Sequence, residues 1–245
     1  MVAKYLDNED SYFSVLEALR AAGWEHSSDV QIVWIDAEEL EKSPKTAKKV
    51  LGSVDGIVVP GGFGSRGIEG KILAADFAMK NNIPYLGLCL GMQVAAIAAV
   101  RQTGLKNANS TEFDPTTSEP VINTMPGQVG KEGTGGTMRL GAYECVLEPG
   151  SIASKLYKKS TIFERHRHRY EFNNKYIQAL NKQGIEISGI WKKQGLAEII
   201  EHKNHPFFVA CQFHPEFTSR PNRPHPLFSG FINALKKHSK LATIN

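Results

Sequence analysis

The sequence predicts an α/β protein whose parallel sheet is covered by helices on both faces. Short apolar runs typical of buried strands alternate with longer helical stretches through the first hundred residues. The length of 245 residues suits one large domain or two small ones. The composition, 41% hydrophobic and 22% charged, is typical of a globular protein and excludes the disordered and fibrous classes.

The first half of the chain carries the regular alternation. Strands are predicted at residues 2–5, 30–35, 56–59 and 83–88. Helices are predicted at 10–22, 68–81 and 89–103, with shorter helical pieces over 37–49 that Pro44 separates. Asp10 or Ser11 is a suitable cap for the first helix, and Gly23 is expected to end it. Residues 60–67 form a glycine-rich loop between a strand and a helix.

The second half is less regular. Residues 116–136 contain Pro120, Pro126 and five glycines from Gly127 on, which predicts a long loop. Further strands are predicted at 143–147, 161–170, 185–191, 196–200 and 207–213, and a last helix at 225–238. We find no internal repeat, so we expect one domain, 1–245, with an irregular middle.

Several classes of protein are disfavoured. A net charge of +4 is too small to indicate nucleic-acid binding by itself. Three cysteines without regular spacing exclude a disulfide scaffold and suit a reducing, cytoplasmic compartment. The first ten residues lack the apolar core of a signal peptide. Residues 83–100 carry no charge, but Pro84, Gly91 and Gln93 divide them into a strand and a helix, so no membrane span is expected.

The most informative motif surrounds Cys89. The run Gly87-Leu-Cys-Leu-Gly91 follows a predicted strand and opens a predicted helix, as a nucleophile elbow does. The helix N-terminus directs free N–H groups and a partial positive charge at the thiol, which favours the reactive thiolate. We therefore interpret Cys89 as a nucleophile, whereas Cys145 and Cys211 lack this context and are interpreted as structural.

A base for this thiol is available downstream. His214 follows an apolar strand and precedes Pro215, and strand ends are where ligands gather in parallel sheets. Glu216, two residues further on, is positioned to orient the imidazole. Cys89, His214 and Glu216 therefore form a candidate catalytic triad.

This combination resembles the class I (triad) glutamine amidotransferases. Longer runs are similar to the glutaminase domain of the CTP synthase family, and the resemblance extends from about Lys4 to Lys237. The runs are Pro60-Gly-Gly-Phe-Gly-Ser-Arg-Gly67, Asn109-Ser-Thr-Glu-Phe113, Gly135-Gly-Thr-Met-Arg-Leu-Gly141, Arg165-His-Arg-His-Arg-Tyr-Glu171 and Gln212-Phe-His-Pro-Glu-Phe217. The resemblance implies a three-layer, flavodoxin-like α/β fold with a mostly parallel central sheet.

The same resemblance implies a reaction and a binding site. The reaction is hydrolysis of L-glutamine to glutamate and ammonia through a γ-glutamyl thioester on Cys89. Backbone N–H groups of Gly62 and Leu90 would hold the oxyanion. Arg169 would bind the α-carboxylate of glutamine and Glu112 its α-ammonium, while Gln93 would line the pocket.

In this family the ammonia aminates UTP to CTP in an N-terminal synthetase domain that binds ATP, UTP and Mg. We expect that domain to be absent from this chain, so these ligands and oligomer contacts would come only with a synthetase partner. GTP is a possible activator, and the glycine-rich loop ending at Arg139 is where we would expect it. The alternatives are a free-standing γ-glutamyl hydrolase and a catalytically weak partner-binding module.

Three other motifs resemble ligand-binding motifs but are not expected to bind those ligands. Residues 62–67 match the dinucleotide fingerprint, but no acidic residue follows at the required spacing. Residues 165–169 resemble a basic patch, yet a strand would place their arginines and histidines on opposite faces. A zinc site is not expected, since Cys211 and His214 would also point to opposite faces of a strand.

Overall fold

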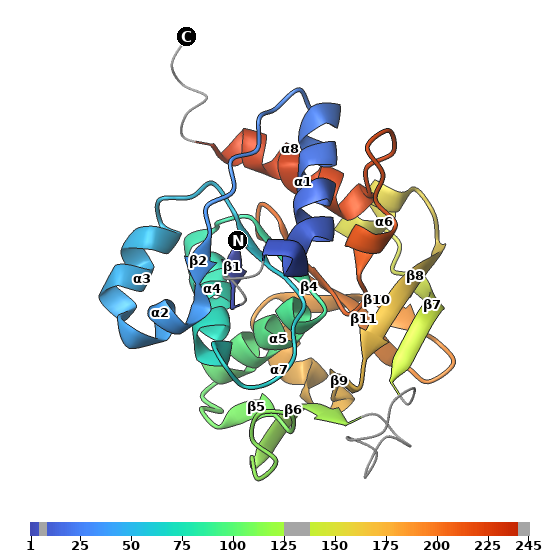
Figure 1. Ribbon diagram of the computed structural model, residues 1–245. Coiled ribbons are helices and arrows are strands. Elements are labelled where there is room, and N and C mark those ends of the chain that lie inside the picture. Colours follow the sequence, from blue (N-terminus) through green and yellow to red (C-terminus); the bar gives the residue numbers. More distant parts are fainter. Residues whose placement is uncertain (5–8, 125–137, 240–245) are drawn as a thin grey trace.

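The computed structural model describes residues 1–4, 9–124 and 138–239. A seven-stranded sheet forms its centre (Figure 1). In spatial order, its strands are β3 (Ile57–Val59), β4 (Tyr85–Leu88), β12 (Phe208–Cys211), β11 (Leu196–His202), β10 (Ile185–Trp191), β7 (Arg139–Leu147) and β8 (Thr161–His168). Two small sheets flank it: β1 (Val2–Ala3) with β2 (Ile35–Asp36), and β5 (Ala108–Ser110) with β6 (Glu119–Thr124) and β9 (Tyr170–Phe172).

Helices cover both faces of the central sheet, which confirms the predicted α/β class (Figure 1). One face carries α2 (Ala37–Lys42), α3 (Pro44–Leu51), α4 (Ile68–Asn81), α5 (Leu90–Gln102) and α7 (Ile177–Lys182). The other carries α1 (Phe13–Glu25), α6 (Ile152–Tyr157) and α8 (Pro226–His238). Three short 3₁₀ helices complete the described elements: η1 (Glu9–Tyr12), η2 (Asn174–Tyr176) and η3 (Pro215–Phe217).

Successive residues of the central strands pack into the hydrophobic cores on opposite faces of the sheet. Along β4, Tyr85 packs into the core under α4 and α5, whereas Leu86 and Leu88 pack into the core under α1 and α8. Such continuous burial, with all four residues of β4 buried, is expected of a strand covered on both faces. It explains why this segment is apolar without a break.

The sheet is mixed, so the expectation of a mostly parallel sheet was wrong. β3, β4 and β12 run parallel, but the pairs from β12 through β11, β10 and β7 to β8 are all antiparallel. The connections give the reason. A parallel pair such as β3 and β4 requires a crossover, which α4 provides, whereas β10 and β11 are joined by a tight turn at residues 192–195 that permits only a hairpin.

Some predicted boundaries also differ. Only Ile35 of the predicted 30–35 strand is in β2, because the short β1 is the only partner that this extended segment has within the described residues. The helix expected at 10–22 begins as η1 and continues past Gly23 to Glu25, without a side-chain cap at Tyr12. Part of the predicted 116–136 loop is the strand β6, whose Val121 and Ile122 are buried, and residues 125–136 lie outside the described part of the chain.

The parallel half of the sheet creates the site. β3, β4 and β12 end side by side, with Val59 opposite Gly87 and Leu88 opposite Cys211. The segments that leave these three strands begin at Pro60, Cys89 and Gln212. Residues that are more than 120 positions apart in the sequence therefore meet at one edge.

Candidate active site

The backbone around Cys89 is tightly constrained. Cys89 has φ 51° and ψ −100°, a region that non-glycine residues rarely enter and that costs about 1–3 kcal/mol. The positions two residues before and after it must be glycines, since a Cβ on Gly91 would lie 2.2 Å from the carbonyl oxygen of Val59, and one on Gly87 would lie 2.8 Å from the Cβ of Ala210. The glycines therefore allow α5 to approach the sheet closely and hold Cys89 at the helix N-terminus.

His214 lies between a thiol and a carboxylate. Its Nδ1 is 2.7 Å from Oε1 of Glu216, the middle residue of η3, and both side chains are buried. Burial lowers the pKa of His214, but interactions with Cys89 and then Glu216 outweigh it and raise this pKa to about 10. The ring of Phe217 stacks on the imidazole at a centroid distance of 5.1 Å. The histidine is thus held in one orientation by a hydrogen bond and an aromatic contact.

The glycine-rich loop packs directly against this pair. A Cβ on Gly61 would lie 2.8 Å from Cε1 of His214 and 3.6 Å from the Cβ of Cys89. A Cβ on Gly62 would lie 3.4 Å from Cδ2 of Leu90, the first residue of α5. The structure therefore brings Gly62 and Leu90 together beside Cys89, where backbone N–H groups of a first helical turn lack intrahelical partners.

Hydrogen bonds to Lys4 and Glu112 hold the glycine-rich loop from two sides. Nζ of Lys4 donates to the carbonyl oxygens of Phe63 and Gly64, the latter at 2.9 Å. On the other side, Oε1 of Glu112 accepts from the N–H of Gly64 at 2.8 Å. Burial raises the pKa of Glu112, while the Gly64 N–H and Lys4 oppose this rise. Glu112 therefore lies beside the loop that contains the predicted oxyanion glycine.

Gln93 reaches the thiol through a second glutamine. Its Nε2 donates to Oε1 of Gln212 at 3.2 Å, and Nε2 of Gln212 lies 3.6 Å from Sγ of Cys89. The same Nε2 of Gln93 is 3.2 Å from the carbonyl oxygen of Tyr170, the residue after Arg169. Arg169 is at the bend between β8 and β9 and is half-buried. The residues predicted to bind glutamine thus border the same strand ends as Cys89.

A buried network of ion pairs surrounds Arg139. Nη1 of Arg139 is 2.6 Å from Oε1 of Glu198 and 3.2 Å from Oε1 of Glu171, and its side chain is only 1% exposed. Its guanidinium also stacks over the rings of Tyr143 and Trp191. Arg139 is therefore a structural residue that does not reach a ligand at the surface, and the rest of the loop expected to bind GTP lies outside the described residues.

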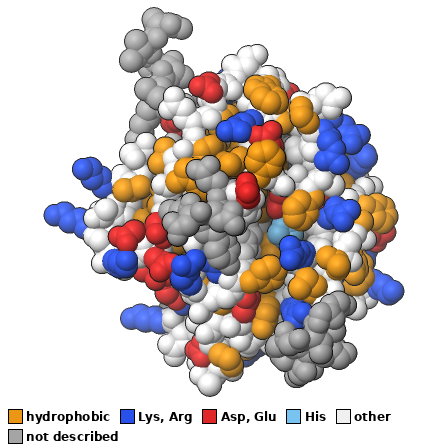
Figure 2. Space-filling view, in the orientation of Figure 1, with side chains coloured by type: hydrophobic (Ala, Val, Ile, Leu, Met, Phe, Trp, Pro, Cys, Tyr) orange, Lys and Arg blue, Asp and Glu red, His pale blue; other side chains and the backbone are white. Residues whose placement is uncertain are grey.

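The basic run 165–169 behaves as a strand over most of its length. Burial alternates along β8, so that His166 and His168 face inward while Arg165 and Arg167 face outward, as predicted. The outer surface over β7 and β8 combines basic with hydrophobic side chains (Figure 2). Leu140, which is 60% exposed, pairs with Arg167, and Phe163 is 66% exposed.

Three site residues were missed by the sequence analysis. Gly61 was treated as part of a turn, and Gln212 as part of an apolar strand. The burial of Lys71 could have been predicted from the sequence. It lies three residues after Ile68 and four before Ala75, so it belongs to the buried face of α4. Its side chain is completely buried close to the Gly62 turn.

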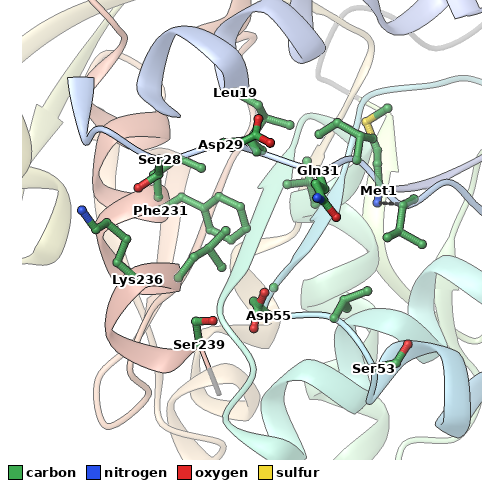
Figure 3. A pocket seen from close by; sticks show the side chains of 18 residues that line it. Met1, Leu19, Ser28, Asp29, Gln31, Ser53, Asp55, Phe231, Lys236 and Ser239 are labelled. Carbon is green, nitrogen blue, oxygen red and sulfur yellow. Dashed lines mark hydrogen bonds between the residues drawn. The ribbon is translucent and has the colours of Figure 1, made fainter. Parts of the chain in front are cut away.

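A separate cleft lies at the N-terminal end of β3, away from Pro60 at its other end. It has a volume of about 610 Å³ and opens between residues 28–33, the segment before β3, and α8 (Figure 3). Phe231 and Leu19 form apolar walls, and Asp29 and Asp55 are among its polar side chains. None of its lining residues is a cysteine or histidine, so it lacks the nucleophile and base that Cys89 and His214 combine.

Among the described residues, no helix has the length and hydropathy needed to cross a membrane. In the same ranges, 1–4, 9–124 and 138–239, no three His, Cys, Asp or Glu residues cluster in a way that would hold a metal ion.

The site can now be compared with known proteins. The family model described as glutamine amidotransferase class-I matches residues 6–234. The chain is 55% identical over 236 residues to CTP synthase of Caldanaerobacter subterraneus subsp. tengcongensis, which covers 96% of this chain and 44% of that protein. It is 56% identical over 242 residues to CTP synthase of Carboxydothermus hydrogenoformans, at 98% and 45% coverage. The chain thus spans less than half the length of these relatives.

A solved structure extends the comparison to the fold. The Trypanosoma brucei CTPS glutaminase domain with bound acivicin superposes with a TM-score of 0.90 and 42% identity, covering 97% of this chain and 93% of that one. This agreement extends over almost the whole of both chains. The chain therefore belongs to the class-I glutamine amidotransferase family, as a glutaminase domain of the CTP synthase type.

Proposed function

We propose that this domain hydrolyses glutamine with Cys89 as nucleophile, His214 as acid and base, and Glu216 as the residue that orients His214. The observation that carries the proposal is the position of His214, which packs with Cys89 against Gly61 and is 2.7 Å from Glu216. A raised imidazole pKa beside a thiol favours the thiolate–imidazolium pair that this chemistry requires.

The reaction follows from these positions. The Cys89 thiolate attacks the side-chain carboxamide carbon of glutamine, and backbone N–H groups of Gly62 and Leu90 stabilise the oxyanion. The C–N bond then breaks while imidazolium His214 gives its proton to the leaving nitrogen, which departs as ammonia. Neutral His214 next takes a proton from water, and the resulting hydroxide cleaves the γ-glutamyl thioester to glutamate and free thiol.

The substrate is held by polar groups on three sides. Arg169 binds the α-carboxylate through its planar fork, and Glu112 receives the α-ammonium. Gln93 lines the side of the pocket next to Gln212. The contact of Gln93 with the Tyr170 carbonyl supports this arrangement, because it ties the bend that carries Arg169 to the elbow helix.

The ammonia is proposed to serve a synthetase partner. The full-length relatives are CTP synthases, and this chain matches about 44% of the first of them. We propose that ammonia passes to a synthetase domain, which binds ATP, UTP and Mg and aminates UTP to CTP. Activation by GTP remains a prediction without an assigned residue in this chain.

Glutamate release from glutamine tests the proposal. Wild type, Cys89→Ala and Cys145→Ala are assayed with and without a separately expressed synthetase domain, ATP, UTP and GTP. Cys145, a buried thiol of β7, is the matched control. An electrophilic glutamine analogue followed by peptide mass mapping identifies the thiol that is modified.

We expect activity in wild type and Cys145→Ala, no activity in Cys89→Ala, and a higher rate when the synthetase is present. Modification should fall on the peptide that contains Cys89. Activity that depends on Cys89 but is unaffected by the synthetase would indicate a free-standing γ-glutamyl hydrolase. Absence of both activity and labelling under every condition would favour a partner-binding module.

A further inference from the structure

Lys71 is a buried amine that the proposed mechanism does not use. It is the fourth residue of α4, and its exposed fraction is 0%. Among the described residues, its Nζ has no hydrogen-bond partner. A buried ammonium without a partner opposes folding, so a lysine at this position needs a reason other than stability.

The position of Lys71 suggests the reason. A Cβ built on Gly62 would lie 3.7 Å from Nζ of Lys71 and 3.4 Å from Cδ2 of Leu90. The amine therefore lies directly behind the turn whose N–H is proposed to hold the oxyanion. Because Gly62 has no side chain, the amine packs close to its backbone, together with Leu90 and the Cε of Lys4 at 3.4 Å from the same built Cβ.

Two charged or titratable groups act on Lys71. Burial, followed by the nearby Lys4, lowers the pKa of Lys71 to about 7, and Cys89 opposes this effect. Lys4 donates hydrogen bonds to the carbonyl oxygens of Phe63 and Gly64, so it holds the glycine-rich loop in place. Lys71 thus faces a cation that disfavours its charge and a thiol that favours it when ionised.

We propose that Lys71 is an electrostatic positioning residue, whose ammonium stabilises the Cys89 thiolate and the oxyanion through the Gly62 turn. The inference rests on the proposed function. With a neutral thiol, nothing on the described residues compensates the ammonium. When Cys89 loses its proton or the oxyanion forms, the buried cation gains a counter-charge in a medium of low dielectric constant.

If Lys71 has a role in packing alone, the expected effect on the Cys89 thiol is different. If Lys71 only fills space, replacing it by methionine, which has a similar length and no charge, leaves Cys89 unaffected. In the electrostatic role, Lys71→Met removes a buried charge and so increases stability, yet makes the thiol less acidic. Stability and thiol reactivity therefore change in opposite directions only if the proposal is correct.

The experiment measures the rate of alkylation of Cys89 by iodoacetamide between pH 5 and 10. Iodoacetamide is neutral and reacts with the thiolate, so the profile reports the ionisation of the thiol. Wild type, Lys71→Met and Lys71→Gln are compared, with peptide mapping to confirm the site. Lys80→Met is the matched control, because Lys80 lies on α4 and is exposed beside Asp76. Thermal unfolding and glutaminase kcat and KM are measured on the same proteins.

We expect both Lys71 variants to shift the alkylation profile to higher pH, with a rate roughly tenfold lower at pH 7. The variants should lower kcat with little change in KM, and Lys71→Met should raise Tm. Lys80→Met should match wild type. If Lys71→Met and Lys71→Gln give profiles that superimpose on wild type, the inference is wrong. If Cys89 of wild type shows no preferential alkylation, the proposed function itself fails.

Discussion

Cys89 has the least favourable backbone conformation among residues of the site, and this strain is functionally informative. With φ 51° and ψ −100°, the residue forms the corner at which β4 ends and α5 begins. Strain of this kind persists only where surrounding contacts enforce it. The N–H of Cys89 donates to the carbonyl oxygen of Cys211 at 2.7 Å, which anchors the corner to the neighbouring strand. The thiol is therefore presented in one direction.

The charge state of His214 depends on Cys89. In Cys89→Ala, we expect the pKa of His214 to fall well below about 10, because the effect of the thiol is lost and only Glu216 opposes burial. Two-dimensional NMR of ¹⁵N-labelled imidazole across pH 4–11 measures this value. Cys145→Ala should leave it unchanged. An equal imidazole pKa in Cys89→Ala and wild type would show that the two side chains do not interact.

The same pKa shift has a consequence for stability. A folded-state pKa above the ordinary value means that the folded protein binds the proton more tightly than the unfolded chain does. The stabilisation from His214 is therefore complete below about pH 6.5 and is lost as the pH rises through about 10.

At the scale of elements, the contact between α5 and β3 depends on Gly91. We expect Gly91→Ala to destabilise the protein by about 1–3 kcal/mol and to reduce glutaminase activity, because the new Cβ would lie 2.2 Å from the Val59 carbonyl oxygen and displace the helix that carries Leu90. Urea unfolding and glutamate release are the measurements.

A glycine elsewhere provides the control. A Cβ on Gly52, at the end of α3, would lie 3.0 Å from the Lys48 carbonyl oxygen, a much milder contact. Gly52→Ala should therefore retain activity. Gly91→Ala with wild-type stability and activity would show that α5 does not need its close approach to the sheet.

Elements with strong local signals were predicted accurately. The helix α4 spans the predicted residues 68–81, and β10 spans the predicted 185–191. By contrast, α6 and α7 have six residues each and were missed. The first of these depends on a distant residue, since Glu201 of β11 accepts from the N–H groups of Ile152 and Ala153. The helix α6 also has a local cap, since Ser151 accepts from the N–H of Ser154, but six residues show too little periodicity for a prediction.

At the scale of the whole molecule, a chain of hydrogen bonds joins the central sheet to the smaller sheet of β9. Nδ1 of His168 is 3.2 Å from the Tyr170 carbonyl oxygen, so this nitrogen must donate. Nε2 of His168 then accepts from Nδ1 of His166 at 2.8 Å. The remaining Nε2 of His166 is an acceptor 3.4 Å from Oε2 of Glu198. An acceptor nitrogen facing Oε2 favours the protonated form of Glu198, whereas Arg139 at 2.6 Å from Oε1 favours the ionised form.

Burial raises the pKa of Glu198 to about 7 against the opposing effect of Arg139, so this carboxyl is expected to titrate near neutral pH. Because the folded state holds the proton more tightly, the free energy of unfolding should fall as pH rises from about 5 to 8. Glu198→Gln keeps the shape of the protonated acid without titrating. We expect its stability relative to wild type to increase over this range by roughly 1–3 kcal/mol, measured by urea unfolding at pH 5 and pH 8.

Glu201 is a matched contrast on the same strand. Its carboxylate accepts two backbone N–H bonds, at 2.7 and 2.8 Å, so Glu201→Gln places a donor against a donor. We expect this variant to be less stable than wild type by about 1–3 kcal/mol at both pH values. A stability difference between Glu198→Gln and wild type that does not change with pH would mean that Glu198 is ionised.

The sequence by itself determined the alternation of strands and helices, the elbow at Cys89 and the His214-Pro-Glu216 segment. Each of these depends on residues close together in the chain, whose spacing records local geometry. Only the tertiary structure decided the direction of the strands beyond β12, the burial of Lys71 behind Gly62 and the burial of Glu198 beside Arg139. These features depend on which distant segments share an edge or a core, and the solvation of a buried charge is set by those neighbours rather than by its own segment.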